Sequence, residues 1–209
     1  MKVKVTPSKV HGNVKIPASK SMAHRALICA SLSDGTSLVS NVTNSKDIEA
    51  TVGCMKALGA IIKQIDETTY EVTGTNLFKQ EGNITCNANE SGSTLRFLIP
   101  LAACTNAKVK FLGQGRLLQR PMDVYANEFK KQNIEFNQSD KEIIVSGNLQ
   151  AKDYVVQGDI SSQFITGFMF VLPLLDQDST LTITEPYESK SYVNPVSYTH
   201  LTLPTNSLV

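Results

Sequence analysis

A serine-containing loop followed by an apolar run occurs three times in this chain of 209 residues. The copies begin at Ser19, Ser91 and Ser161, so the motif recurs roughly every 70 residues. Each copy follows a predicted strand and opens a nearly all-apolar predicted helix, which must be buried on most sides. Such a chain has to fold as a series of equivalent units that bury these helices against one another.

The segments between the copies also match one another. Each of the first two copies continues with a strand, an amphipathic helix and a hairpin, so the unit is β-α-β-α-β-β and the fold class is α/β (α+β). The helical stripes are Ile48, Val52, Met55 and Leu58 in the first copy and Val124, Tyr125 and Phe129 in the second. The expected strands are 14–16, 36–39, 61–65, 70–72, 83–86, 107–112, 134–136, 143–145, 154–156 and 179–183.

The third copy breaks off after residue 194. Residues 195–209 contain two prolines and no Asp, Glu, Lys or Arg, and they lack helical periodicity. We expect this tail to be foreign sequence rather than a native continuation, and a strand-like edge segment is the alternative. The expected domain therefore covers residues 16–194, with its third repeat truncated.

The composition excludes several classes of function. With 41% apolar residues, 19% charged residues and a formal net charge of +1, the chain has no overall basicity for nucleic acid. Its longest apolar runs are too short to span a bilayer, and residues 1–7 contain no signal-peptide core. The four cysteines lack C-x-x-C spacing, which predicts free buried thiols. We expect a cytoplasmic protein without membrane or nucleic-acid partners.

The first copy of the loop carries the strongest chemical signal. Lys20 and His24 are four residues apart, as are Ser21 and Arg25, so a helix that begins near Ser19 places both pairs in its first turns. Free backbone N–H groups and the positive end of the helix dipole collect there, which favours an anionic ligand. The alternative is that Ser19 only caps the helix, that the cations are solvated and that His24 is a packed or capping histidine.

Arginine is used sparingly and in particular places. Only four of the 20 cationic residues are arginine, and all lie in or beside junctions with Gly, Ser or Pro: Arg25, Arg96, Arg116 and Arg120. Because the planar guanidinium matches carboxylate and phosphate, this placement indicates anion binding. In the structural alternative, Arg96 and Arg120 cap carbonyls or pair with acids, Arg116 is a solvated surface residue, and Gly92 only marks a tight turn.

Five motifs, in order along the chain, resemble those of the enolpyruvyl transferases. They are residues 19–26, 89–96, 116–122, 161–163 and 189–192, and they span about the N-terminal half of such an enzyme. In that family, two similar domains each contain three β-α-β-α-β-β units in an inverse α/β barrel, and the active site lies in the cleft between them. The resemblance implies one such domain here, with residues 1–15 as a first strand that belongs to the second domain.

Within the family, the motifs are most similar to those of the shikimate-pathway branch. This implies transfer of the carboxyvinyl group of phosphoenolpyruvate to the 5-hydroxyl of shikimate 3-phosphate, with release of phosphate and without a metal or cofactor. Each substrate brings a carboxylate and a phosphate, so cations and helix N-termini are needed to offset the repulsion between them. The full-length enzyme is expected to be a monomer that acts on these two small molecules.

The resemblance also assigns roles to individual residues. Lys20 is expected to contact both substrates and to take part in proton transfer, and Gln163 to contact both. Gly92 and Arg116 are expected to receive phosphoenolpyruvate. The residues expected to bind shikimate 3-phosphate are Lys20, Ser21, Arg25, Ser161, Ser162, Gln163 and Ser189. Residues of secondary importance are Asp47, Arg96, Arg120 and Tyr192.

Two other functions stay open on the sequence. The sister enzyme that acts on UDP-N-acetylglucosamine would carry Lys-Asn at positions 20–21 and lack the following arginine. It usually has a cysteine near residues 116–121, where this chain has none. The other is a non-catalytic half-enzyme that binds shikimate 3-phosphate weakly. Since the family's acid and base carboxylates come from the second domain, we expect this chain alone to be inactive.

Overall fold

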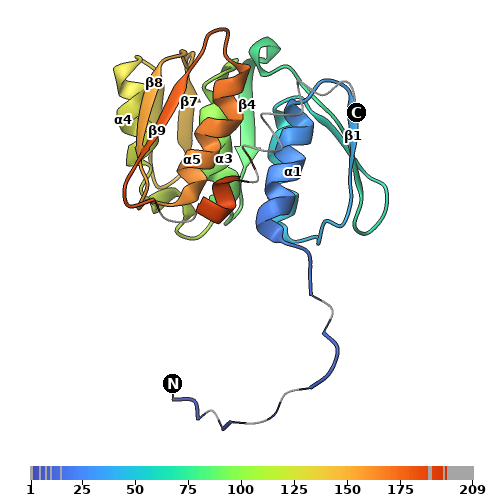
Figure 1. Cartoon of the computed structure of the whole chain (residues 1–209). Coiled ribbons are helices and arrows are strands. Elements are labelled where there is room, and N and C mark those ends of the chain that lie inside the picture. Colours follow the sequence, from blue (N-terminus) through green and yellow to red (C-terminus); the bar gives the residue numbers. More distant parts are fainter. Residues whose placement is uncertain are drawn as a thin grey trace.

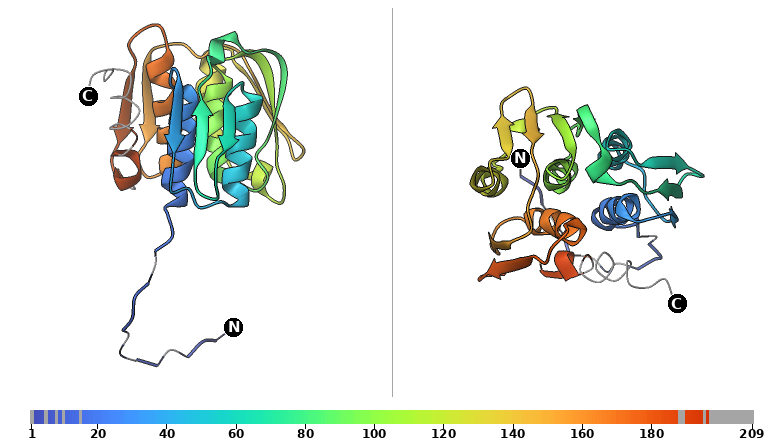
Figure 2. Two further views of the ribbon diagram at one scale, coloured as in Figure 1. Left: turned by 90° about the vertical axis from the view of Figure 1, so that its right-hand side faces the viewer. Right: turned by 90° about the horizontal axis from the view of Figure 1, so that it is seen from above.

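The computed structural model describes residues 2–4, 6–7, 9, 11–14, 16–187, 190–194 and 196. Within these residues, three sheets lie around a group of helices. The three apolar helices, α1 (Lys20–Leu32), α3 (Gly92–Ala102) and α5 (Ser162–Val171), run side by side (Figure 1), and the view from above places them together at the centre (Figure 2). Helices inside and sheets outside are the arrangement of the expected inverse α/β barrel.

The first copy of the repeat forms a three-stranded sheet. After α1 come β1 (Thr36–Val39), α2 (Lys46–Ala57), β2 (Ile61–Gln64) and β3 (Tyr70–Thr73). The strand order is β1-β3-β2, and both pairings are antiparallel. On α2, the predicted stripe faces the core, with Ile48, Met55 and Leu58 fully buried. The helix ends before Gly59, whose φ of +100° is a conformation that glycine adopts without strain.

The second copy contains all six elements of the predicted unit. They are β4 (Glu81–Asn87), α3, β5 (Asn106–Leu112), α4 (Asp123–Lys131), β6 (Glu135–Gln138) and β7 (Ile143–Ser146). Their sheet has the order β4-β5-β7-β6, with β4 parallel to β5 and the other pairs antiparallel. The β5-β7-β6 part has the same order and directions as β1-β3-β2, which confirms the predicted repeat.

The third copy repeats the start of the unit. It consists of β8 (Asp153–Gln157), α5 and β9 (Thr180–Thr184), and β8 pairs with β9 in parallel, as β4 does with β5. Three-residue 3-10 helices lie in the connections: η1 (Leu77–Lys79), η2 (Leu117–Gln119) and η3 (Leu172–Leu174). Residues 190–194 are helical. The expected tail lies outside the described residues except for Val196.

The strand expected at residues 14–16 is wrong. Val14 and Ile16 are 85% and 84% exposed and neither is in a strand. In the second and third copies the first strand pairs in parallel with the strand after the apolar helix, which in the first copy is β1. Among the described residues β1 pairs only with β3. A short apolar segment that no neighbouring strand meets cannot form ladder hydrogen bonds, so its pattern alone does not make it a strand.

The contact between α3 and α5 depends on two special residues. Pro100 has no N–H to donate to the carbonyl of Arg96 one turn earlier, and the Tyr125 hydroxyl of α4 donates to that carbonyl instead, at 2.7 Å. Gly167 lets α5 approach at the same place, since a Cβ there would lie 2.9 Å from the Arg96 carbonyl oxygen. Around this contact the Tyr125 ring packs on Phe164 and Phe168.

Candidate anion-binding site

Each of the three apolar helices begins at the serine that the repeat predicts. Ser19 Oγ accepts from the Met22 N–H at 3.4 Å, Ser91 Oγ from Thr94 at 3.2 Å, and Ser161 Oγ from Gln163 at 3.4 Å. The first turns, residues 19–21, 91–93 and 161–163, together form a surface that we call the N-terminal edge. Its unsatisfied N–H groups and helix dipoles favour anions.

Side-chain hydrogen bonds hold these first turns together. Gln163 Nε2 donates to Ser93 Oγ at 2.8 Å, which connects the first turns of α5 and α3. Arg25 Nη2 donates to Thr166 Oγ1 at 3.1 Å, which connects α1 to α5. The expected residues Lys20, Gly92, Ser162 and Gln163 therefore lie on one connected edge rather than on separate surfaces.

Lys20 forms an ion pair at the exposed rim of the edge. Its Nζ lies 2.6 Å from Asp47 Oδ2, and the two side chains keep 54% and 30% of their exposure. Because both groups face solvent, the pair contributes little stability and can open for a ligand. The neighbouring Asp47 carbonyl accepts from Thr94 Oγ1 at 3.3 Å, which ties α2 to α3.

Arg25, in contrast, is only 3% exposed. Its Nη1 donates to the carbonyl and the hydroxyl oxygen of Ser21, at 2.9 and 2.6 Å, and its guanidinium lies 4.9 Å from the centre of the Phe97 ring. Burial lowers the pKa of Arg25 to about 10, so the group stays charged at neutral pH. Among the described residues no carboxylate forms an ion pair with it. Because Ser21 Oγ accepts from Arg25, its own proton is free for a ligand.

His24 lies in the core, which agrees with the alternative that it is a packed histidine. It is fully buried, and its Nδ1 lies 2.7 Å from Thr51 Oγ1. Thr51 Oγ1 is also 2.7 Å from Thr94 Oγ1, which lies 2.8 Å from the capping Ser91 Oγ. Burial lowers the pKa of His24 to about 4, with Lys20 adding to the effect, so the ring is neutral near pH 7. This chain of hydrogen bonds joins α1, α2 and the start of α3.

Two further arginines reach the start of α3. Arg96 Nη1 donates to Gln163 Oε1 at 2.9 Å, and its guanidinium stacks over the Phe164 ring at 5.0 Å. Arg120 Nη1 occupies the space that a side chain at Gly92 would need. Burial lowers the pKa of Arg96, and the nearby charge of Arg120 lowers it further. Neither arginine pairs with an acid within the described part of the chain, so the acid-pairing half of the structural alternative does not hold for these two residues.

The structure says less about three of the expected site residues, of which two are exposed and one lies outside the described residues. Arg116 precedes η2 on the surface. Its carbonyl accepts from the Gln119 N–H at 3.2 Å, and its guanidinium forms no hydrogen bond or ion pair with another described residue. Its loop packs beside the start of α3, because the Gln114 N–H donates to the Asn89 carbonyl at 2.7 Å. Tyr192 is 50% exposed in the helical residues 190–194. Ser189 lies outside the described residues.

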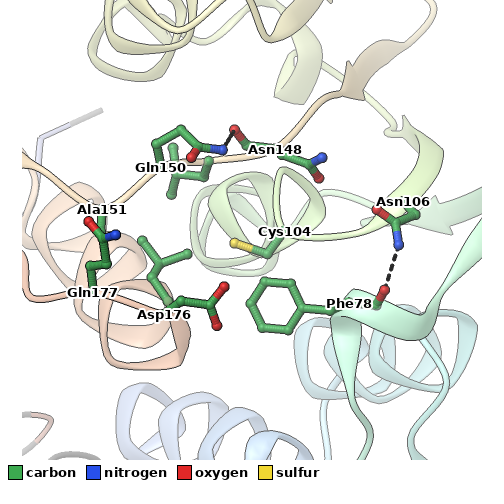
Figure 3. Close-up of a pocket in the computed structure, with 10 residues that line it drawn as sticks. Phe78, Cys104, Asn106, Asn148, Gln150, Ala151, Asp176 and Gln177 are labelled. Carbon is green, nitrogen blue, oxygen red and sulfur yellow. Dashed lines mark hydrogen bonds between the residues drawn. The ribbon is translucent and has the colours of Figure 1, made fainter.

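A cavity of about 330 Å³ lies at the opposite end of the central helices (Figure 3). Cys104, just after α3, and Leu175, just after η3, are among its lining residues, together with Asn148, Gln150 and Asp176. Helix C-termini carry partial negative charge, and the only charged side chain in the lining is a carboxylate. The cavity contains none of the expected site residues and does not suit an anion.

Sequence reasoning missed the polar residues that connect the helices, chiefly Thr51, Thr94 and Thr166. Each is a fully buried threonine within an otherwise apolar helical face. A threonine in a stripe that must be buried requires a hydrogen-bond partner, so the apolar pattern contained a usable signal. It could not name the partners, because those lie on other helices.

The described residues contain no group of three or more His, Cys, Asp or Glu side chains placed to hold a metal ion. None of the described helices is long and apolar enough to cross a membrane.

Repeated β-α-β-α-β-β units around central helices define the class of inverse α/β barrel domains, and a cationic edge lies at the helix N-termini of this one. The model of one family matches residues 5–197: EPSP synthase (3-phosphoshikimate 1-carboxyvinyltransferase). Because this match covers most of the sequence, the chain belongs to the EPSP synthase family.

Curated relatives agree with this assignment, and solved structures share the fold. The chain is 48% identical over 194 residues to the 3-phosphoshikimate 1-carboxyvinyltransferase of Clostridium kluyveri, and 45% identical over 205 residues to that of Clostridioides difficile. These matches cover 92% of this chain but only 45% and 46% of the relatives, so the chain spans about half their length. The EPSP synthase of Acinetobacter baumannii shares the fold, with a TM-score of 0.73 at 18% identity over 88% of this chain and 42% of that one.

Proposed function

We propose that the N-terminal edge binds shikimate 3-phosphate and phosphoenolpyruvate for transfer of the carboxyvinyl group to the 5-hydroxyl. The observation that carries the proposal is the meeting of three serine-capped helix N-termini with Lys20, Arg25, Arg96 and Arg120. Two substrates that each carry a carboxylate and a phosphate need this density of donors and positive charge. We also propose that the full-length enzyme is a monomer in the cytoplasm.

Shikimate 3-phosphate is assigned to the first turns of α5 and α1. Its phosphate accepts from the hydroxyls of Ser161 and Ser162 and from free N–H groups at the start of α5, and Ser189 belongs to the same proposal. Its carboxylate lies on the side of Ser21, whose proton Arg25 leaves free. Arg25 thus supports the contact electrostatically while it fixes the Ser21 hydroxyl.

Phosphoenolpyruvate is assigned to the start of α3. The absent side chain at Gly92 gives an anion access to the backbone N–H groups and leaves room for Arg120. Arg116, whose guanidinium has no partner among the described residues, is close to this turn because its loop is bonded to Asn89. Gln163, whose Nε2 donates to Ser93 Oγ on α3, lies between the two assigned positions and is assigned to contact both substrates.

The N-terminal edge would promote carboxyvinyl transfer by positioning the two substrates and by neutralising their charges. Cations that neutralise both substrates let the 5-hydroxyl approach the electrophilic carbon, and fixed donors need no rearrangement as charge develops. Lys20 is the candidate for proton transfer, because its ammonium is exposed at the start of α1. Asp47 holds it in place in the absence of substrate.

The sister reaction on UDP-N-acetylglucosamine is less consistent with the site. That enzyme would have Asn in place of Ser21 and would lack the arginine that follows. Here Arg25 and Ser21 form a hydrogen-bonded pair at the edge. A half-enzyme that only binds shikimate 3-phosphate would use the same residues, so a binding measurement tests the site and a turnover assay separates the two.

Joint replacement of Ser161 and Ser162 by alanine tests the proposed phosphate position. We expect shikimate 3-phosphate binding, measured by calorimetry, to weaken at least about tenfold, because charge-assisted hydrogen bonds to phosphate are lost. Loss of the Ser161 cap alone costs about 1 kcal/mol, so the melting temperature should fall by only about 2–4 °C.

Asn76→Ala is the matched control. Asn76 Oδ1 accepts from the Phe78 N–H at 3.0 Å and caps η1, near the cavity at the other end of the helices. This variant should lower the melting temperature by a comparable amount and leave binding intact. If the serine variant binds shikimate 3-phosphate as tightly as the parent chain, the two serines are caps and nothing more.

A further inference from the structure

The Gln163 side chain lies between an obligate donor and a hydroxyl. Arg96 Nη1 donates to its Oε1 at 2.9 Å, and its Nε2 donates to Ser93 Oγ at 2.8 Å. A guanidinium has no acceptor, so only the amide carbonyl can face Arg96. The amide orientation, which coordinates alone seldom define, is therefore set by the chemistry of its neighbour.

This orientation determines what the N-terminal edge offers to a ligand. Ser93 Oγ accepts from Gln163, so the single hydroxyl proton of Ser93 does not point back at the amide. The second Nε2 proton of Gln163 is also unused by Ser93. With the free N–H groups at the start of α3, the edge then presents donors at this position, and the Gln163 carbonyl oxygen faces Arg96 instead.

The surroundings of Arg96 indicate that its role is not simply to pair with an acid. No carboxylate within the described part of the chain forms an ion pair with it, and its buried Nε has no hydrogen-bond partner. Arg120, a second guanidinium, is close enough to affect it electrostatically. Two like charges are held near one helix N-terminus, where they repel each other unless an anion lies between or beside them.

We propose that Arg96 is a positioning residue: by fixing the Gln163 amide, it makes Gln163 and Ser93 donors toward an anionic carboxylate or phosphate oxygen at the start of α3. This inference rests on the proposed function and deepens it, since it explains how an uncharged glutamine and serine discriminate in favour of an anion. Arg25 and Ser21 form the same kind of pair on α1, where a guanidinium donates to a serine oxygen.

Four variants of the chain test the proposal, with phosphoenolpyruvate and inorganic phosphate as separate probes in an NMR titration. Arg96→Met removes the donor and Ser93→Ala removes the hydroxyl, and each should weaken binding of phosphoenolpyruvate about tenfold or more. The double variant should lose little beyond either single variant, because both changes break one chain of hydrogen bonds. Arg96→Lys keeps a cationic donor toward Oε1 and should retain most of the binding.

The free chain provides a readout that is independent of ligand. The side-chain NH₂ signals of Gln163 should be widely separated in the parent chain and should collapse toward solvent-exposed values in Arg96→Met and in Ser93→Ala. Lys108→Met is the control for loss of one charge, since Lys108 pairs with Glu135 on the outer sheet. It should leave the Gln163 signals and binding unchanged.

Additive losses in the double variant would overturn the proposal, as would Gln163 signals that do not respond to Arg96→Met. Equal losses of binding in Arg96→Met and Lys108→Met would also overturn it, because Arg96 would then act by net charge alone. A parent chain that binds neither probe would also contradict it. If phosphate and phosphoenolpyruvate bind as expected but shikimate 3-phosphate does not, the positioning role stands and the proposed function fails.

Discussion

Gly167→Ala is expected to destabilise the chain by about 3 kcal/mol. The new Cβ would lie 2.9 Å from the Arg96 carbonyl oxygen and 3.1 Å from Pro100 Cγ, and it would collide with the Tyr125 hydroxyl. Overpacking of a tight core costs about 1–3 kcal/mol, and loss of the Tyr125 hydrogen bond adds about 1 kcal/mol. The melting temperature should fall by about 10 °C.

The same substitution should also disturb the N-terminal edge. Pushing α5 away from α3 lengthens the contact between Gln163 and Ser93, which is 2.8 Å in the structure. Gly53→Ala is the matched control, because Gly53 lies within α2 and a Cβ there would meet nothing within 4 Å. That change should be neutral or stabilise the helix by about 0.5–1 kcal/mol. Equal melting temperatures for the two variants would contradict the close contact of α3 and α5.

Stability is expected to fall by about 3 kcal/mol between pH 7 and pH 4 because of His24 alone. The pKa of this ring is 6.5 in the unfolded chain and about 4 in the folded one, where burial disfavours the charged form. Between these values the unfolded chain binds more protons, so lowering the pH favours unfolding. The contribution of neutral His24 to the free energy of unfolding is complete above pH 6.5. It is lost as the pH falls toward 4, at about 1.4 kcal/mol per pKa unit.

Urea denaturation of the parent chain and of His24→Asn across this pH range measures the effect. The asparagine variant cannot be protonated, so the difference between its stability and that of the parent chain should change by about 3 kcal/mol between pH 7 and pH 4. His11→Asn is the control, since His11 is exposed in the N-terminal segment. A constant difference between the parent chain and His24→Asn would show that His24 is not buried as a neutral ring.

Most of the fold could be predicted because the sequence repeats. A strand, an apolar helix and a serine cap occur at equivalent places, and one period assigned elements to all three copies. The exception is the segment around Val14 and Ile16, where apolar alternation predicted a strand. Pairing needs a neighbour as well as a pattern, and no described strand supplies one.

The candidate site was predictable in its location but not in its connections. Serine caps and sparse arginines pointed to the helix N-termini, and the three first turns do lie together. The sequence could not indicate that Arg25 is buried under Ser21 and Phe97, or that Arg96 bonds to Gln163. Both contacts join residues of different helices or of successive helical turns, and their geometry depends on how α1, α3 and α5 pack.

The most direct measurement is an amide NMR titration of the chain with shikimate 3-phosphate. If the three first turns form one anion-binding edge, signals of residues 19–21 and 161–163 should shift along a single saturation curve. Those of residues 91–93 should follow through the hydrogen bond from Gln163 to Ser93. Shifts confined to one helix, or located around the cavity at Asn148 and Asp176, would contradict the account.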